Sequence, residues 1–155
     1  MLYHFFLALH SASRWMIVVC LIALLVRAYM GWKKKYHMKP YDYILQIVTL
    51  ILLYIQFIVG LTLYFESPIV HYFIKNFNEA IKLRQVRFFG MEHITMMTIG
   101  ILVFTIGYIK ARKKQSSVAK FKTIFIYTAW AICIIFTSIP WEFSPLTSRP
   151  SFRMF

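Results

Sequence analysis

Two histidines, His10 and His93, each lie near the start of a long apolar run. Arg27 and Lys110 follow them at the same spacing of 17 residues, and each marks the far end of its run. At 1.5 Å per residue, each imidazole would lie roughly 26 Å from that basic end if the runs are helices. Two imidazoles at one depth on facing helices can clamp a b-type haem through both axial positions of its iron. The spacing therefore predicts a site for one haem, suited to electron transfer.

The same histidines have other interpretations. They could serve another metal, a proton or a quinone, or they could be polar groups that hydrogen-bond neighbouring helices. His4 and His71 are expected on the same side of the membrane, where they and His10 would offer three imidazoles to copper or zinc. Their spacing matches no compact metal-binding motif. The equal depth of His10 and His93 favours the haem site over these alternatives.

Three further polar residues are predicted near the histidine layer. Arg14 follows the first histidine by four residues, so it shares a helix face one turn deeper. A guanidinium inside the membrane needs an anion, and the sequence offers Glu92, Glu66, Glu142 or a cofactor carboxylate. Gln56 falls at a similar depth on the second apolar run. We therefore group Arg14, Glu92 and Gln56 with the two histidines as candidate cofactor-binding residues.

The elements that must position these residues are membrane spans. The chain has 155 residues, of which 60% are hydrophobic, and it carries a formal net charge of +13. A soluble domain of this size could not bury so much apolar surface. The basic residues flank the apolar runs, which indicates lipid headgroups rather than nucleic acid as their partner. Four runs reach the length that a helix needs to cross the bilayer, at about 5–28, 43–65, 88–109 and 121–141.

The short links between the spans predict their direction. GWKKKYHMKP and KARKKQSSVAKFK are both rich in lysine and arginine. By the positive-inside rule both links are cytoplasmic, so both termini are extracytoplasmic. The fold class is therefore an all-α, up-down-up-down four-helix bundle in which spans one and three are diagonal neighbours. Gly60, Gly100 and Gly107 would let helix backbones or a flat macrocycle approach closely.

The remaining segments complete a single transmembrane domain, residues 1–142. Between spans two and three, apolar residues recur at helical spacing after Ser67 and Pro68. This pattern predicts an amphipathic helix at about 68–86, lying in the outer membrane interface. Residues 143–155 contain two prolines and little periodicity, and we expect an irregular extracytoplasmic tail.

Short motifs in all four spans resemble a known family. LHSASRW in the first span, GLTLYF in the second, RFFGMEHITMM in the third and IPW after the fourth are similar to small bacterial four-span membrane proteins labelled cytochrome b-like. The resemblance implies a protein of the bacterial inner (cytoplasmic) membrane with His10 and His93 as haem ligands and Arg14 and Glu92 as supporting residues. Respiratory haem-b proteins carry two histidine pairs, whereas this chain has one. A single haem near the outer face cannot by itself carry an electron across the bilayer.

Two functions follow as hypotheses. The first is a membrane b-type cytochrome that passes electrons between quinol and an extracytoplasmic acceptor, with haem b as cofactor and a quinone as a second ligand. The alternative is a non-catalytic accessory subunit of a larger membrane complex, or a homo-oligomer, with structural histidines. Signatures of soluble enzymes, such as a phosphate-binding loop, GxSxG or HExxH, are absent from the sequence. Both hypotheses place the chain in a lipid bilayer, and neither makes it a stand-alone enzyme.

Overall fold

The computed structural model describes residues 2–141, and within them the chain is all-α. The predicted tail at 143–155, together with Glu142, lies outside the described residues. Four helices are long and apolar enough to cross a membrane, which confirms the four predicted spans and a multi-pass membrane protein. They are α1 (Leu2–Lys33), α2 (Pro40–Glu66), the run Arg84–Arg112 formed by α5 (Arg84–Arg87), η1 (Phe88–Glu92) and α6 (His93–Arg112), and α7 (Ser117–Thr137).

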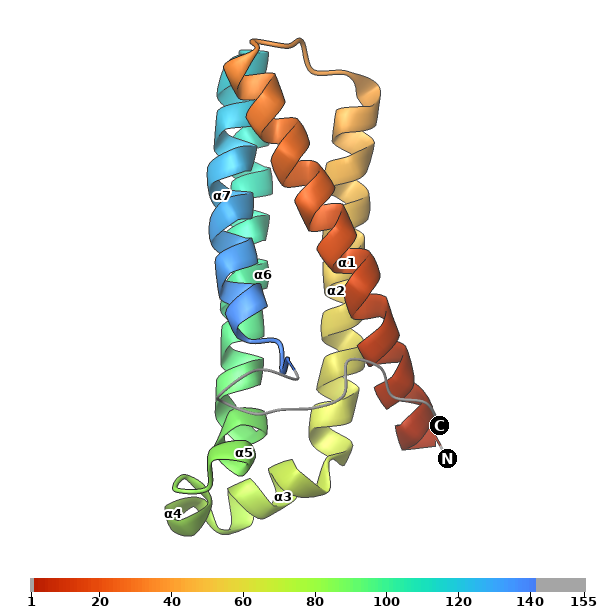
Figure 1. Ribbon diagram of the computed structural model, residues 1–155, viewed down its shortest axis with the longest axis vertical. Coiled ribbons are helices and arrows are strands. Elements are labelled where there is room, and N and C mark those ends of the chain that lie inside the picture. Colours follow the sequence, from red (N-terminus) through yellow and green to blue (C-terminus); the bar gives the residue numbers. More distant parts are fainter. Residues whose placement is uncertain (1, 142–155) are drawn as a thin grey trace.

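The four spans pack as a bundle of alternating direction (Figure 1). α1 packs against α2 and α7, while α6 packs closely against α7 and more loosely against α2. This arrangement leaves α1 and α6 as diagonal partners. The two short loops, at 34–39 and 113–116, lie at one end of the bundle, which we call the loop end. The first residues of α1 lie toward the opposite end (Figure 1).

The half of the bundle next to the loop end has a filled core. The apolar side chains that fill it are at most 4% exposed: Leu21, Leu24, Ala28, Phe104, Phe121 and Ile124. Gly31 lets α1 approach α7 closely, because a Cβ there would come within 2.5 Å of the Phe121 ring. Since little room remains in this half, any sizeable ligand inside the bundle must bind in the other half.

An ion pair joins α1 to the start of α2. Arg27 Nε donates to Asp42 Oδ1 at 2.7 Å, and Asp42 is only 1% exposed. The other carboxylate oxygen of Asp42 accepts from the backbone N–H of Lys39 at 2.8 Å, directly before α2 begins at Pro40. The side chain thus satisfies one of the donors that a helix start leaves without an intrahelical partner. This contact fixes the loop between the first two spans.

The link between α2 and the third span differs from its prediction. Instead of one helix at 68–86, the structure has three short ones: α3 (Pro68–Lys75), α4 (Phe77–Ala80) and α5. The break falls at Asn76, whose φ of −126° and ψ of 45° are not helical and whose side chain donates back to the Tyr72 carbonyl oxygen. Val70, Phe73 and Ala80 are nevertheless buried, and α3 lies across the end of the bundle (Figure 1). The single continuous helix was a wrong prediction.

Candidate functional site

The two predicted histidines meet between the diagonal helices. The ring centroids of His10, on α1, and His93, at the start of α6, are 6.5 Å apart with an interplanar angle of 72°. Sequence spacing could give their depth but not the direction in which each side chain points. The structure turns both rings toward the same interior space.

A hydrogen bond fixes the orientation of His93. Its Nδ1 lies 2.8 Å from the carbonyl oxygen of Ser138, just beyond the end of α7. A carbonyl oxygen only accepts, so Nδ1 carries the proton and donates. In the neutral ring the lone pair then resides on Nε2, which is the form of imidazole that binds metals. The rings of Phe88 and Phe89 pack beside it, with centroids at 5.7 and 6.2 Å.

A π-helical turn precedes His93. The segment FFGME, η1, adopts this wider turn, and Gly90 lies in the middle of it. The Gly90 carbonyl oxygen accepts from Tyr64 Oη at 2.8 Å, while its Cα packs against the Phe73 side chain, where a Cβ would not fit. These contacts tie the turn to α2 and α3. The turn therefore holds the first residue of α6 in a fixed position.

Packing rather than a ring hydrogen bond positions His10. Gln56 donates to the His10 carbonyl oxygen at 2.7 Å and accepts from Ser13 Oγ at 2.6 Å, so it holds the backbone of that turn. The ring lies against Gly60, where an added Cβ would be 3.0 Å from His10 Cε1. The Nδ1 atom of His10 is buried and has no hydrogen-bond partner among residues 2–141. Gly60 was expected to admit a helix backbone or a flat macrocycle, whereas its close neighbour in the structure is the imidazole of His10.

Both histidines line a cavity of about 190 Å³. Its lining on α1 runs from Tyr3 to Val18, fifteen residues further along, which at 1.5 Å per residue is roughly 22 Å of helix. Most of the lining is apolar, and residues of α2, α3, α6 and α7 contribute to it. The cavity is therefore elongated along the helices, with two imidazoles in its wall.

Arg14 also lines the cavity, between two tryptophans. Its Cζ lies 5.4 Å from the Trp15 ring centroid and 5.9 Å from that of Trp141, and the two rings are 5.8 Å apart. Such stacking on aromatic faces stabilises a guanidinium in an apolar setting. The contact with Trp141 had no signal in the sequence, because Trp141 is more than a hundred residues from Arg14.

Glu92 lies apart from the other candidates. It accepts from Arg87 Nε at 2.6 Å and is not part of the cavity lining among the described residues. The spacing of five residues between the two partners fits the π-turn that connects them. Glu92 is therefore an ion-pair partner of Arg87 in this structure, whereas His10, His93, Arg14 and Gln56 all border the cavity.

No protein-family model, curated protein or solved structure matches this chain, so the resemblance to the cytochrome b-like proteins identifies no family here. Within residues 2–141, no group of three or more His, Cys, Asp or Glu side chains is placed to hold a metal ion. The copper or zinc site that would join His4, His71 and His10 therefore has no support in the described part of the chain.

Proposed function

We propose that this protein is a membrane b-type cytochrome that holds one haem between His10 and His93. The observation that carries the proposal is the meeting of these two rings, from diagonal helices, at the wall of one elongated cavity. Two imidazoles bound to opposite sides of one metal, each by a bond of about 2 Å, have ring centres roughly 6 Å apart. The observed 6.5 Å is close to this value.

The hydrogen bonds and burial of the two rings support the same proposal. Metal-binding histidines commonly donate their second ring N–H to a backbone carbonyl, as His93 does to Ser138. The Nδ1 atom of His10 is buried without a hydrogen-bond partner among the described residues, so its lone pair would be available to the iron. Arg14 offers a cation to a haem propionate at the cavity wall.

When bound, a b-type haem supplies one-electron oxidation and reduction. His10 and His93 would hold it through their imidazoles, and a haem held by two histidines would supply electron transfer rather than oxygen chemistry. The apolar lining of the cavity would exclude water from the bound group. In this proposal the haem lies near the outer face of a bacterial inner membrane, both termini are extracytoplasmic, and electrons pass from quinol to an extracytoplasmic acceptor.

Alanine variants of the two histidines test the proposal. The protein is purified in mild detergent from haem-replete cells, and its dithionite-reduced minus oxidised visible spectrum is recorded. We expect sharp b-type bands at about one haem per chain. His10→Ala and His93→Ala should each abolish these bands without preventing membrane insertion, because each removes one axial ligand.

His71→Ala is the matched control, because His71 is exposed on α3 and is not part of the cavity lining. It should keep the full spectrum. If His10→Ala combined with His93→Ala retained all of its haem, the assignment of ligands would be wrong.

The alternative function is an accessory subunit of a larger membrane complex. The bond from His93 to Ser138 is equally compatible with this alternative, because an interhelical hydrogen bond alone would give this histidine a structural role. A flat visible spectrum from folded, inserted protein would support this alternative and exclude the cytochrome.

A further inference from the structure

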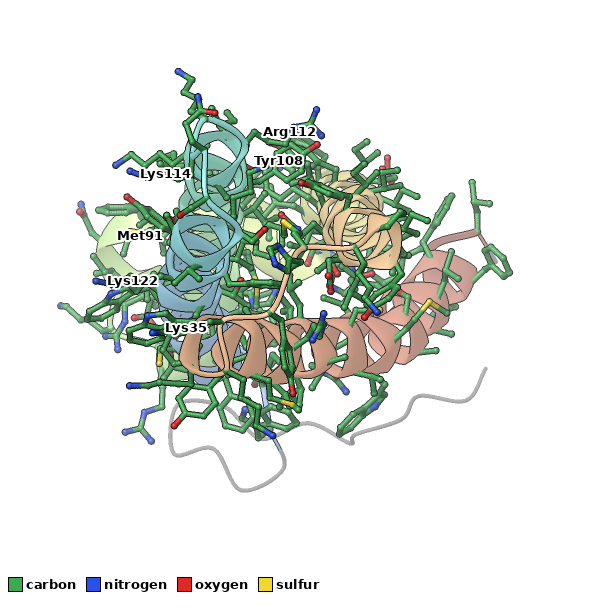
Figure 2. The ribbon with its side chains drawn as sticks, turned by 90° about the horizontal axis from the view of Figure 1, so that it is seen from above. Lys35, Met91, Tyr108, Arg112, Lys114 and Lys122 are labelled. Atoms are coloured by element: carbon green, nitrogen blue, oxygen red, sulfur yellow. The ribbon has the colours of Figure 1, made fainter. Side chains whose placement is uncertain are left out.

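The loop end of the bundle carries a large excess of positive charge. Eleven basic residues lie there: Arg27, Lys33, Lys34, Lys35, Lys39, Lys110, Arg112, Lys113, Lys114, Lys120 and Lys122. Figure 2 looks onto this end and labels several of them around the ends of the spans. Asp42 is the one acidic residue there within the described chain, and it is buried against Arg27. The remaining cations have no carboxylate at this end among residues 2–141.

Two of these lysines share one aromatic ring. Lys33 Nζ lies 4.5 Å from the centroid of the Trp32 ring, and Lys122 Nζ lies 5.6 Å from the same centroid. The first lysine belongs to α1 and the second to α7, so the ring gathers cations from two spans. The attraction of an ammonium group to an indole face holds each lysine near the ring. Two positive charges held near one ring favour the binding of an anion beside them.

An aromatic surface continues from this ring along the helices. Trp32 packs against Phe125, with centroids 5.6 Å apart, and Phe125 packs against Tyr29 at 5.5 Å. Tyr29 is 47% exposed and lies one turn closer to the middle of the span than Trp32. The side of the molecule at α1 and α7 therefore presents cations at the end and exposed apolar surface next to them.

We propose that Lys33, Trp32 and Lys122 bind the phosphate headgroup of an anionic phospholipid, whose acyl chain lies along Phe125 and Tyr29. The charge of the lysines complements the phosphate, and basic pockets between spans are known to select such headgroups. The adjoining aromatic surface lies in a span, where the acyl chain of a lipid can contact it. A soluble anion has no acyl chain and would make no contact there. This site is separate from the haem proposal and does not depend on it.

A lipid titration followed by native mass spectrometry tests this site. The full-length protein in detergent is titrated with phosphatidylglycerol and, in parallel, with phosphatidylcholine. We expect the wild type to bind phosphatidylglycerol more tightly than phosphatidylcholine. Each lysine near an anionic lipid strengthens the binding of that lipid. Lys33→Gln combined with Lys122→Gln should therefore weaken phosphatidylglycerol binding about tenfold or more.

The control variant combines Lys34→Gln with Lys113→Gln. It removes the same charge from the same end and changes no lysine that contacts Trp32. It should weaken phosphatidylglycerol binding by less than about threefold. Equal losses in the two double variants would show a diffuse charge effect and overturn the site. Full competition by soluble glycerol phosphate would overturn the lipid assignment, because the acyl chain would then contribute nothing.

Discussion

At the scale of residues, the two histidines are held in different ways. His93 is fixed by a hydrogen bond from its own ring to Ser138, whereas His10 is fixed by a tethered backbone and by contact with Gly60. Helical rise made their common depth predictable from the sequence. The contacts with Ser138 and Gly60 were not predictable, because they depend on how each helix is rotated about its axis and on side-chain packing between distant segments.

Gly60→Ala should displace the ring of His10. The added Cβ would lie 3.0 Å from Cε1, inside the usual carbon–carbon contact distance of about 3.5–4.0 Å. We expect a severalfold loss of haem per chain and a loss of about 1–3 kcal/mol in the free energy of unfolding. The haem absorbance per chain measures the first effect, and unfolding of the protein in detergent solution measures the second.

Gly31→Ala is the control for this prediction, because its Cβ would crowd Phe121 in the filled half of the bundle rather than a histidine. It should lower stability to a similar degree while keeping about one haem per chain. An equal loss of haem in both alanine variants would mean that Gly60 has no special relation to His10.

At the scale of elements, the π-turn before α6 changes which side chains are neighbours. Arg87 and Glu92 pair across it, although residues five apart lie on different faces of an ordinary α-helix. The sequence placed Glu92 beside His93 and so suggested a supporting role in the haem site. An apolar run with regular spacing predicts a helix but gives no sign of a local change in its winding, and for this reason the pairing was missed.

Glu92→Gln should leave the haem spectrum unchanged. Arg87 and Glu92 are 34% and 30% exposed, so water screens their attraction and the pair contributes less than about 1 kcal/mol to stability. Visible spectra and unfolding curves of Glu92→Gln and of Arg87→Gln measure the haem content and the stability of each variant. A haem loss as large as that of His93→Ala would contradict the structure and restore Glu92 to the cofactor site.

A second prediction at this scale concerns the contact between α1 and α2. Asp42→Asn removes the buried carboxylate that pairs with Arg27, whose side chain is 20% exposed, and should destabilise the protein by about 2 kcal/mol. Tyr41→Phe removes only an exposed hydroxyl that accepts from Arg27 and should cost less than about 1 kcal/mol. Unfolding in detergent distinguishes the two variants. Similar stabilities would show that the ion pair contributes little.

At the scale of the whole molecule, the number, order and alternating direction of the four spans followed from the sequence. Apolar length specifies a span, and short links force neighbouring spans to be antiparallel. The sequence did not predict that one half of the bundle is filled while the other half is not. Both halves contain bulky apolar residues, and only the packed structure reveals that Phe121 and Ile124 fill one half while the other half encloses a cavity.

The cavity wall is divided between two parts of the chain. α1 and α2 supply one side, with His10, and α6 and α7 supply the other, with His93, while α2 and α6 pack only loosely across the seam between them. A molecule bound to both histidines would therefore act as a cross-link between two helical hairpins. Because a ligand that binds only the native state adds to its stability, the empty bundle would open first along the seam between α2 and α6.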